Sequence, residues 1–356
     1  LSGSSEKNMI YSPLNVYMAL GMLAELTDGN SRQQILDLLG SKDINSLRSQ
    51  AADLWNANYK DDGMVTSILA SSLWLNQDIK FNQSTLNLLA AKYLASTYQG
   101  EMGSDSFNKE LQNWLNEQTG GLLKEQASSV ELSPDTILAL ATTIYYRARW
   151  HDEFWEENTK EDVFHAKGQD ETCEFLNKQK SYETYYMGDK FSAVAQSLQG
   201  SGSMWFLLPN EGVTVDELLN DKQAVKFLVS KDRQKQVEKK NAYVNLSVPK
   251  FDAASQFGLK DGLKALGVTD VFDENVSDFS PMTELEGLYV SKADHAARVA
   301  IDEEGVTAAA YTVIGVDAAG AMVTEEEIDF IVDRPFLFAV TGSDGLPLFA
   351  GVVNQP

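Results

Sequence analysis

The sequence has few of the residues from which metal centres and catalytic sites are usually built. Its 356 residues include one cysteine, Cys173, and three histidines, His151, His165 and His295. A single cysteine excludes an internal disulfide, and it also excludes a thiolate cage for zinc or for an iron–sulfur cluster. Three histidines leave little material for a site based on imidazole. We therefore expect a protein that carries no metal ion and no cofactor.

Positive charge is scarce as well. Lysine and arginine together number 29 against 52 aspartate and glutamate residues, which gives a formal net charge of -23. An acidic surface repels phosphate groups, so neither nucleic acid nor an anionic membrane is expected as a partner. No apolar run approaches the roughly 18 residues of a membrane-spanning helix. The opening residues, Leu1-Ser2-Gly3-Ser4-Ser5, lack the basic and apolar regions of a signal peptide.

The sequence does contain enough apolar material for a large core. Hydrophobic residues make up 43% of the chain and aromatic residues 10%, a composition that excludes a disordered protein. The length fits either two domains or one large domain. Because no linker rich in proline, glycine or serine divides the chain and no repeat is visible, we expect one domain over residues 1–356.

Helical patterns fill the first half of the chain. Ser12 is placed as an N-cap before Pro13, and apolar residues then recur at helical spacing. Further helices are predicted at residues 31–39, 81–95 and 109–117. Gly40 ends the first of these. Residues 65–75 form an apolar stretch of the length of a strand.

From about residue 134 onward the pattern changes to short strands separated by turns. Strands are predicted at residues 138–146, 204–209, 243–248, 336–340 and 348–353. The turn Gly342-Ser343-Asp344-Gly345 joins the last two as a hairpin. Helices combined with antiparallel sheets around one core indicate the α+β class.

No motif of a hydrolase or of a phosphate-binding enzyme is present. The chain has no Gly-x-Ser-x-Gly turn, no phosphate-binding loop and no His-Glu-x-x-His sequence. His295 lies among alanines in a strand-like run, and we interpret it as a buried, hydrogen-bonded side chain. Glu325-Glu326-Glu327 is interpreted as a solvated run of charge, with a steering patch for a basic partner as the alternative. We therefore do not expect an enzyme.

Residues 302–324 differ from an ordinary connection. The even-numbered positions from Val306 to Ala318 are nearly all small or apolar, and the odd-numbered positions are more polar on balance. Such alternation continues well beyond the usual strand length of about five or six residues. The many β-branched residues argue against an alanine-rich helix. The pattern predicts a long strand with a glycine hinge, Gly305, at its entry.

Many segments, in the same order along the whole chain, resemble the serpin family. Tyr11-Ser12-Pro13-Leu14-Asn15-Val16 is similar to the start of that family's helix B. Glu303-Glu304-Gly305 with Ala308-Ala309-Ala310 is similar to the hinge of its reactive loop. The other matching segments are Gly29-Asn30-Ser31-Arg32-Gln33-Gln34-Ile35, Trp114 with Thr119-Gly120-Gly121, Ile144-Tyr145-Tyr146-Arg147-Ala148-Arg149-Trp150 with Phe154 and Thr159, Val248-Pro249-Lys250-Phe251, Asp278-Phe279-Ser280, Val290-Ser291-Lys292, Arg334-Pro335-Phe336-Leu337-Phe338 and Leu348-Phe349-Ala350-Gly351-Val352-Val353-Asn354.

The resemblance implies the serpin fold, with about eight to nine helices around three β-sheets. The large central sheet is called sheet A, and the reactive loop would occupy about residues 303–329, either exposed or inserted in that sheet. Most of the family's helix A, which would precede Tyr11, is expected to be absent from this chain. Val306 stands where the family usually has threonine or serine.

The resemblance also implies a polar cluster beneath sheet A, which the family calls the shutter. Its residues here would be Ser12, Asn15, Thr142 and His295. Two of them depart from the usual pattern, because the family has serine at the position of Asn15 and asparagine at the position of Thr142.

A serpin implies a suicide inhibitor of serine proteases. The target protease cuts the loop, and the part from Gly305 onward joins sheet A as a new strand. This insertion moves the cut end by about 45 Å across a molecule roughly 50 Å wide, so the acyl-enzyme would be trapped before hydrolysis. The hinge residues would be Glu303, Glu304, Gly305, Val306, Thr307, Ala308, Ala309, Ala310 and Tyr311.

The reactive bond follows from the family's usual spacing after the hinge, which places it between Ala319 and Gly320. A small residue at this position suits elastase-like or subtilisin-like proteases, whose specificity pocket is small. Because the loop is longer than usual, Met322-Val323 is an alternative bond. Asp317 would instead suit a protease specific for aspartate.

The alternative function is that of a non-inhibitory serpin acting as a carrier, a binding protein or a chaperone. The small residues Ala308-Ala309-Ala310 favour inhibition instead. The expected partner is a target serine protease, held in a covalent acyl complex by a monomeric inhibitor. Heparin is not expected, because residues 44–60, the place of helix D, carry few basic side chains. We expect an extracellular, secreted protein, with a bacterial source as one option, although the acidity and the free cysteine suit an intracellular member equally.

Overall fold

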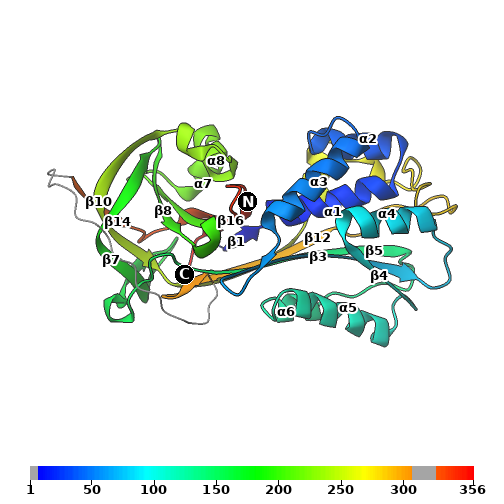
Figure 1. Cartoon of the computed structure of the whole chain (residues 1–356), viewed down its shortest axis with the longest axis horizontal. Helices are drawn as coiled ribbons and strands as arrows, with labels where there is room; N and C mark the ends of the chain where they lie inside the picture. The colour runs from blue at the N-terminus through cyan, green and yellow to red at the C-terminus, as the bar shows by residue number, and fades with distance from the viewer. Residues whose placement is uncertain (1–6, 307–325) are drawn as a thin grey trace.

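The computed structural model describes residues 7–306 and 326–356. Within these residues the chain forms nine α-helices and two hydrogen-bonded sheets (Figure 1). The helices are α1 (Pro13–Leu26), α2 (Gly29–Leu38), α3 (Ile44–Asn58), α4 (Gln83–Tyr93), α5 (Asp105–Gln118), α6 (Lys124–Ser128), α7 (Val215–Leu219), α8 (Lys222–Val229) and α9 (Lys260–Ala265). The strands are β1 (Met9–Tyr11), β2 (Lys60–Asp61), β3 (Val65–Asn76), β4 (Ala95–Gly100), β5 (Leu138–Arg149), β6 (Lys160–His165), β7 (Asp170–Met187), β8 (Phe191–Ser197), β9 (Ser203–Pro209), β10 (Glu238–Pro249), β11 (Phe251–Gly258), β12 (Asp294–Ile301), β13 (Gly305–Val306), β14 (Glu327–Ile331), β15 (Phe336–Thr341) and β16 (Pro347–Val353).

The seven-stranded sheet forms the centre of one half of the molecule. Its strand order is β11-β12-β13-β5-β3-β2, and β4 pairs with β3 in parallel. β3 and β5 are antiparallel along nearly their whole length, from Val65 opposite Ala148 to Leu75 opposite Leu138. Figure 1 shows α1 and α4 on one side of this sheet and α5 and α6 on the other. This is the large central sheet that the sequence predicts, and we call it sheet A.

The nine-stranded sheet occupies the other half of the molecule. Its order is β1-β16-β15-β9-β8-β7-β10-β14, with β6 beside β7. β7 is 18 residues long, and it pairs with β6 near one end and with β8 near the other. β10 follows β7 along most of its length. The resemblance implies two smaller sheets besides sheet A. Here β7 and β10 run through both, so hydrogen bonds join the two smaller sheets into this one nine-stranded sheet.

Helix α1 begins where the sequence predicts. Ser12 has extended backbone angles, and its hydroxyl accepts a hydrogen bond from the N–H of Asn15 at 3.3 Å. Pro13 follows in the first turn, where a helix needs no N–H donor. Most residues of α1 are buried, but no helix within the described residues is long and apolar enough to cross a membrane.

The observed element boundaries differ slightly from those predicted. α2 ends just before Gly40, whose φ of 62° lies in the left-handed region that glycine adopts without strain. The helix predicted at residues 81–95 ends at Tyr93, because Leu94 is left-handed and Ala95 already belongs to β4. Of the strand predicted at residues 302–324, Gly305 and Val306 form β13, and the residues from 307 onward lie outside the described part of the chain.

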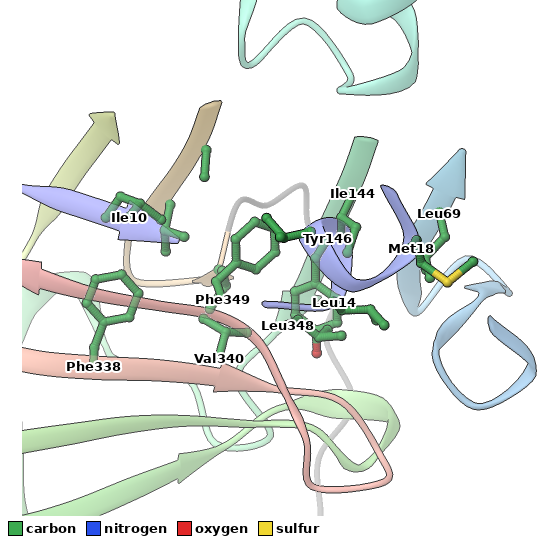
Figure 2. Packing of buried hydrophobic residues seen from close by; sticks show 14 of the residues in the cluster. Ile10, Leu14, Met18, Leu69, Ile144, Tyr146, Phe338, Val340, Leu348 and Phe349 are labelled. Atoms are coloured by element: carbon green, nitrogen blue, oxygen red, sulfur yellow. The ribbon is translucent and has the colours of Figure 1, made fainter. Parts of the chain in front are cut away.

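One hydrophobic core connects the two halves (Figure 2). Ile10 of β1 and Phe338 of β15 belong to the nine-stranded sheet, whereas Leu14 of α1 and Tyr146 of β5 belong to the half built on sheet A. All four side chains are at most 7% exposed. Burial of a large apolar side chain contributes roughly 1.5–3 kcal/mol, so this shared core holds sheet A firmly against the C-terminal hairpin.

Candidate functional site

A tight turn connects β12 to β13. The carboxylate of Asp302 accepts hydrogen bonds from the backbone N–H groups of Glu304 and Gly305, both at 3.0 Å. The N–H of Asp302 donates in return to the carbonyl oxygen of Gly305 at 3.0 Å. Aspartate closes turns in this way because its short side chain reaches the backbone two residues on. A Cβ atom on Gly305 would lie 2.3 Å from the carbonyl oxygen of Ala148, so the turn requires glycine at this point.

The segment that follows β5 holds this turn. The backbone N–H of Trp150 donates to the carbonyl oxygen of Glu304 at 3.0 Å, and that of Phe154 donates to the carbonyl oxygen of Glu303 at 3.1 Å. The indole Nε1 of Trp150 also donates to the carbonyl oxygen of Asp302 at 2.8 Å. Because Trp150 is fully buried, the turn is anchored to the interior of the protein.

Glu303 is held by its side chain as well. Its Oε1 accepts hydrogen bonds from the hydroxyl of Thr159 at 2.8 Å and from the Nζ of Lys250 at 3.1 Å. Lys250 lies 2.9 Å from a carboxylate oxygen of Glu174 on its other side. Partial burial raises the pKa of Glu303, but hydrogen bonds from its own backbone, from Thr159 and from Lys250 outweigh the burial and lower the pKa overall. Glu303 is therefore ionised at neutral pH.

Val306 begins a strand between β5 and β12. It is 3% exposed, and it pairs with Ala148 on β5 and with Ile301 on β12. In the described part of the chain, β5 and β12 are joined only through β13, near their C-terminal ends. Toward the N-terminal ends of the two strands, no described strand lies between them. Residues 138–142 of β5 are accordingly half-buried, although β5 lies in the middle of sheet A.

The space between β5 and β12 is a cavity of about 820 Å³. Its walls include the two strands, one side of α1 along its length from Asn15 to Leu26, and the segment from Leu111 to Ile137 that includes α6. The cavity is open to solvent along part of its length and is lined mainly by apolar side chains. Its position between two strands of one sheet suits one additional strand.

The four predicted shutter residues line this cavity. The N–H of Ser12 donates to the Nε2 of His295 at 3.0 Å, and the hydroxyl of Ser12 donates to the carbonyl oxygen of Leu348 at 2.7 Å. The hydroxyl of Thr142 donates to the Oδ1 of Asn15 at 2.9 Å. The four residues thus make two hydrogen-bonded pairs, one through the backbone N–H of Ser12 and one between two side chains, and each pair joins α1 or its cap to one wall of the cavity.

His295 is a neutral acceptor at this place. It is 4% exposed, and burial lowers its pKa to about 4. Because its Nε2 accepts a hydrogen bond from a backbone N–H, we assign the proton to Nδ1. The interpretation of His295 as a buried, hydrogen-bonded side chain is therefore confirmed. Ser12 caps a helix and donates to a carbonyl oxygen, so its hydroxyl is committed to structure and this pair is no catalytic dyad.

The predicted reactive bonds, Ala319-Gly320 and Met322-Val323, lie outside the described residues, as do the hinge positions 307–311. The sequence analysis assigned no role to Trp150, Thr159 or Lys250. All three stand in segments that resemble the serpin family, but only the structure reveals that they meet at the turn after β12.

A family model described as serpin (serine protease inhibitor) matches residues 1–356. The chain therefore belongs to the serpin family. Serpin-ZX of Arabidopsis thaliana is 29% identical to it, over 99% of this chain and 93% of the relative. Leukocyte elastase inhibitor of Equus caballus is also 29% identical, over 98% of this chain and 93% of the relative.

Solved serpin structures share the fold. The native state of Tengpin, a thermophilic serpin, superimposes with a TM-score of 0.84 at 25% identity, over 100% of this chain and 90% of that one. AtSerpin1 of Arabidopsis, in its native stressed conformation, gives a TM-score of 0.84 at 26% identity, over 100% and 93% of the two chains. A complex of thyroxine-binding globulin with thyroxine gives 0.82 at 22% identity, over 98% and 93%. The fold is thus shared with two solved structures described as serpins and with a thyroxine-binding protein.

Proposed function

We propose that this protein is a suicide inhibitor of serine proteases, whose reactive loop enters the gap between β5 and β12 after it is cut. The observation that carries the proposal is the gap itself. It lies within sheet A, and at its top Val306 already occupies the place of a middle strand. Residues 303–306 are the described part of the predicted hinge, and every residue of an entering strand would have to follow Val306.

The pairing of Val306 sets a register for the residues that follow it. If the strand continues, each step along the loop pairs with one residue earlier on both walls. Ala308 would then lie between Tyr146 and Val299, which are 7% and 4% exposed and face the core. The even-numbered positions of the loop would be buried, in agreement with the small and apolar residues that the sequence has there.

The length of the gap supports the same proposal. In this register the first residue of β5, Leu138, would pair with Val316. Ala319 would follow a few residues later, beyond the end of the sheet. Thirteen residues separate Val306 from Ala319, a distance of about 43 Å in an extended strand. A protease attached at Ala319 would be carried from one end of sheet A to the other.

The chemical step needs nothing beyond the target's own nucleophile. The protease serine would attack the carbonyl carbon of Ala319, an ester would form, and the amine of Gly320 would leave with a proton from the protease. Hydrolysis of that ester by water would release a cut inhibitor, and insertion before hydrolysis would trap the complex. The small side chain at Ala319 supports an elastase-like or subtilisin-like target.

Activation by heparin is not part of the proposal. α3, in the place of helix D, contains one basic residue, Arg48. Its guanidinium makes two contacts of 2.7 Å with the carboxylate of Glu25, a side chain that is 2% exposed. A guanidinium bound in this way is not available to a sulfated chain.

The test is incubation with elastase-like, subtilisin-like, chymotrypsin-like and trypsin-like proteases, followed by denaturing gels. An inhibitor gives a band at the summed mass of the two proteins, and mass spectrometry of the released peptide identifies the reactive bond. Loop-cut protein should also melt at a much higher temperature than intact protein, because sheet A gains its missing strand. If every active protease only cuts the loop and the melting curves coincide, inhibition is wrong and a carrier or chaperone is favoured.

A further inference from the structure

A lysine occupies a position of β7 that faces the core. Lys178 lies directly opposite Leu246 in the ladder between β7 and β10, and Leu246 is 1% exposed. Leu176, two residues earlier on β7, is completely buried. Because alternate residues of a strand and residues directly opposite in a ladder point to the same face, the side chain of Lys178 leaves its strand on the inner side. Lysine is seldom found in such a place without a charged partner.

The ammonium group of Lys178 contacts the segment that follows β5. Its Nζ donates to the carbonyl oxygen of Asp152, and it lies 4.3 Å from the centroid of the Phe154 ring. On its other side it donates to the Oε1 of Gln196 at 2.7 Å. Both oxygens belong to uncharged groups, and the side chains of Phe154 and Gln196 are buried. The groups that enclose the charge on these sides are therefore a carbonyl, an amide and an aromatic ring.

The same segment holds the turn between β12 and β13. The N–H of Phe154 donates to the carbonyl oxygen of Glu303 at 3.1 Å. The ring of Phe154 packs edge-on against Trp150, with 5.4 Å between the centroids, and the indole of Trp150 donates to the carbonyl oxygen of Asp302 at 2.8 Å. A movement of Phe154 away from Lys178 therefore changes the contacts that keep this turn closed.

Two carboxylates act on the charge of Lys178 from a greater distance. Glu183, on the same strand, lies behind Gln196, whose Nε2 donates to the Glu183 carboxylate at 3.0 Å. The carboxylate of Asp152 is largely exposed and lies 3.5 Å from the Nδ1 of His151. β8 and β10 face the ammonium group with neutral side chains. Burial lowers the pKa of Lys178 to about 8, because it outweighs the two carboxylates, which raise the pKa.

We propose that Lys178 is a release device for the hinge: its charge is enclosed while the turn is closed, and it becomes hydrated when the segment after β5 moves to admit the strand that follows Val306. This inference rests on the proposed function, because it assigns a cause to the opening of the gap. Removal of a charge from water costs free energy that a carbonyl and a ring offset only in part. The closed hinge therefore carries a cost that opening removes, and a protonated Lys178 makes opening easier.

An ordinary anchoring role has the opposite consequence. If the contacts of Lys178 with Asp152 and Phe154 only held the segment in place, removal of the ammonium group would loosen the turn. If the buried charge favours opening, a neutral side chain of similar length tightens the turn. Methionine is such a side chain, because it is unbranched, flexible and apolar, and it suits an inward-facing position opposite Leu246.

The titration of Lys178 provides a second distinction. In the open state its amine would have the ordinary pKa of a lysine, about 10.4, whereas the pKa in the closed state is lower. Between the two values the open state binds more protons, so a rise in pH favours the closed state. The equilibrium constant for opening should therefore fall about tenfold from pH 7 to pH 9.

The experiment measures hydrogen exchange in the intact protein, in peptides that contain Trp150 and Phe154, without any protease. The N–H groups of these two residues donate to the turn, so their exchange, divided by the intrinsic rate at each pH, reports its opening. Wild-type protein should be protected about tenfold more at pH 9 than at pH 7. Lys178→Met should exchange at least tenfold more slowly than wild type at pH 7 and should lose the dependence on pH.

Two further variants make the comparison sharp. Lys178→Arg keeps a positive charge at both pH values, so it should open as readily at pH 9 as at pH 7. The matched control is Lys240→Met. Lys240 also lies over an aromatic ring, 5.9 Å from that of Tyr185, but it is paired with the exposed Glu326 at 2.7 Å. Its replacement should leave the exchange of the segment after β5 unchanged.

Faster exchange in Lys178→Met than in wild type would identify an anchor and overturn the release device. Equal protection of the wild-type protein at pH 7 and pH 9 would overturn it too, and so would an effect of Lys240→Met as large as that of Lys178→Met. Melting curves check that each variant is folded, and Lys178→Arg still tests the charge if the methionine variant fails to fold. Because exchange needs no protease, failure of the release device leaves inhibition intact, and failure to trap any protease refutes inhibition whatever the exchange shows.

Discussion

The hydroxyl of Thr142 donates a hydrogen bond of 2.9 Å to the side-chain oxygen of Asn15. This bond joins β5, one wall of the gap, to α1 beneath it. Both residues depart from the usual serpin pattern, and the two departures compensate each other. Where the family has asparagine on the strand and serine on the helix, this chain has a hydroxyl on the strand and an amide on the helix. One hydroxyl therefore still meets one amide across the same interface.

Exchange of the two residues tests that compensation. Asn15→Ser or Thr142→Asn alone should lower stability by about 1 kcal/mol, because each leaves two like groups facing each other. The double variant should recover most of the loss. Unfolding by urea, monitored by tryptophan fluorescence, gives the coupling energy of the cycle, expected at about 0.5–1.5 kcal/mol. Losses that simply add in the double variant would show that the two side chains act independently.

The carboxylate of Glu303 should stabilise the hinge. Glu303→Gln removes the charge that Lys250 and Thr159 contact, and we expect a loss of about 1–2 kcal/mol. The pKa of Glu303 is lowered in the folded state, so its contribution is present above the ordinary range of a glutamate and disappears as the pH falls through the lowered value. Wild-type and variant stabilities should therefore converge in acid.

Glu157→Gln is the matched control for this hinge variant, because Glu157 is exposed and lies in the segment just before Thr159. Thermal melts at pH 7.5 and at pH 3.5 give both comparisons. A difference between wild type and Glu303→Gln that is equally large at the two pH values would contradict the assigned role of the charge.

His295 should make the protein less stable in mild acid. Its folded pKa of about 4 lies below the value of about 6.5 in an unfolded chain. Between these pH values the histidine binds more protons in the unfolded chain than in the folded one. The contribution of His295 to the free energy of unfolding therefore rises with pH from about 4 to about 6.5 and is then constant. The full effect is about 3 kcal/mol.

The matched pair for this measurement is His295→Gln and His165→Gln. His165 is exposed beside Asp170 and its pKa is raised, so it cannot produce a loss of stability in acid. Melting temperatures between pH 4.5 and pH 7.5 should lose much of their slope in His295→Gln and keep it in His165→Gln. An unchanged slope in His295→Gln would assign the acid sensitivity to other groups.

The register set by Val306 predicts opposite behaviour of two neighbouring loop positions. Ala308→Arg would place a charge under the new strand, against Tyr146, at a cost of several kcal/mol. Insertion would slow while acylation at Ala319 would not, so more inhibitor molecules would be consumed per protease. Thr307→Arg, on the outward face, should change that ratio much less. Titration of active protease with each variant measures it, and equal ratios would refute the register.

Local patterns were sufficient to predict several elements. Ser12 before Pro13 marks a helix start by its own chemistry, and the hairpin around Gly342-Ser343-Asp344-Gly345 follows from turn residues between two apolar runs. The burial of His295 could be predicted because its neighbours in the sequence are small and apolar. In each of these cases the residues that decide the structure are close together in the chain.

Contacts between distant segments could not be predicted from the sequence. Lys250 and Glu303 are separated by 53 positions, and Asn15 and Thr142 by 127. Nothing in either short segment specifies its partner. The continuity of β7 through 18 residues was missed for a similar reason, since its polar and apolar residues do not alternate strictly and its course depends on β6, β8 and β10.

The pairing of β1 with β16 sets an order in time for the synthesis of this protein. Met9 lies opposite Val352, and the side chain of Asn8 accepts a hydrogen bond from the N–H of Asn354 at 2.7 Å. A ribosome adding about 5–20 residues per second needs roughly 20–70 s to make the intervening chain. During that time β1 has no partner strand and Ser12 has no His295 to bind. Closure of β1 onto the sheet therefore waits for the synthesis of β16, and until then the first strand has an unpaired edge.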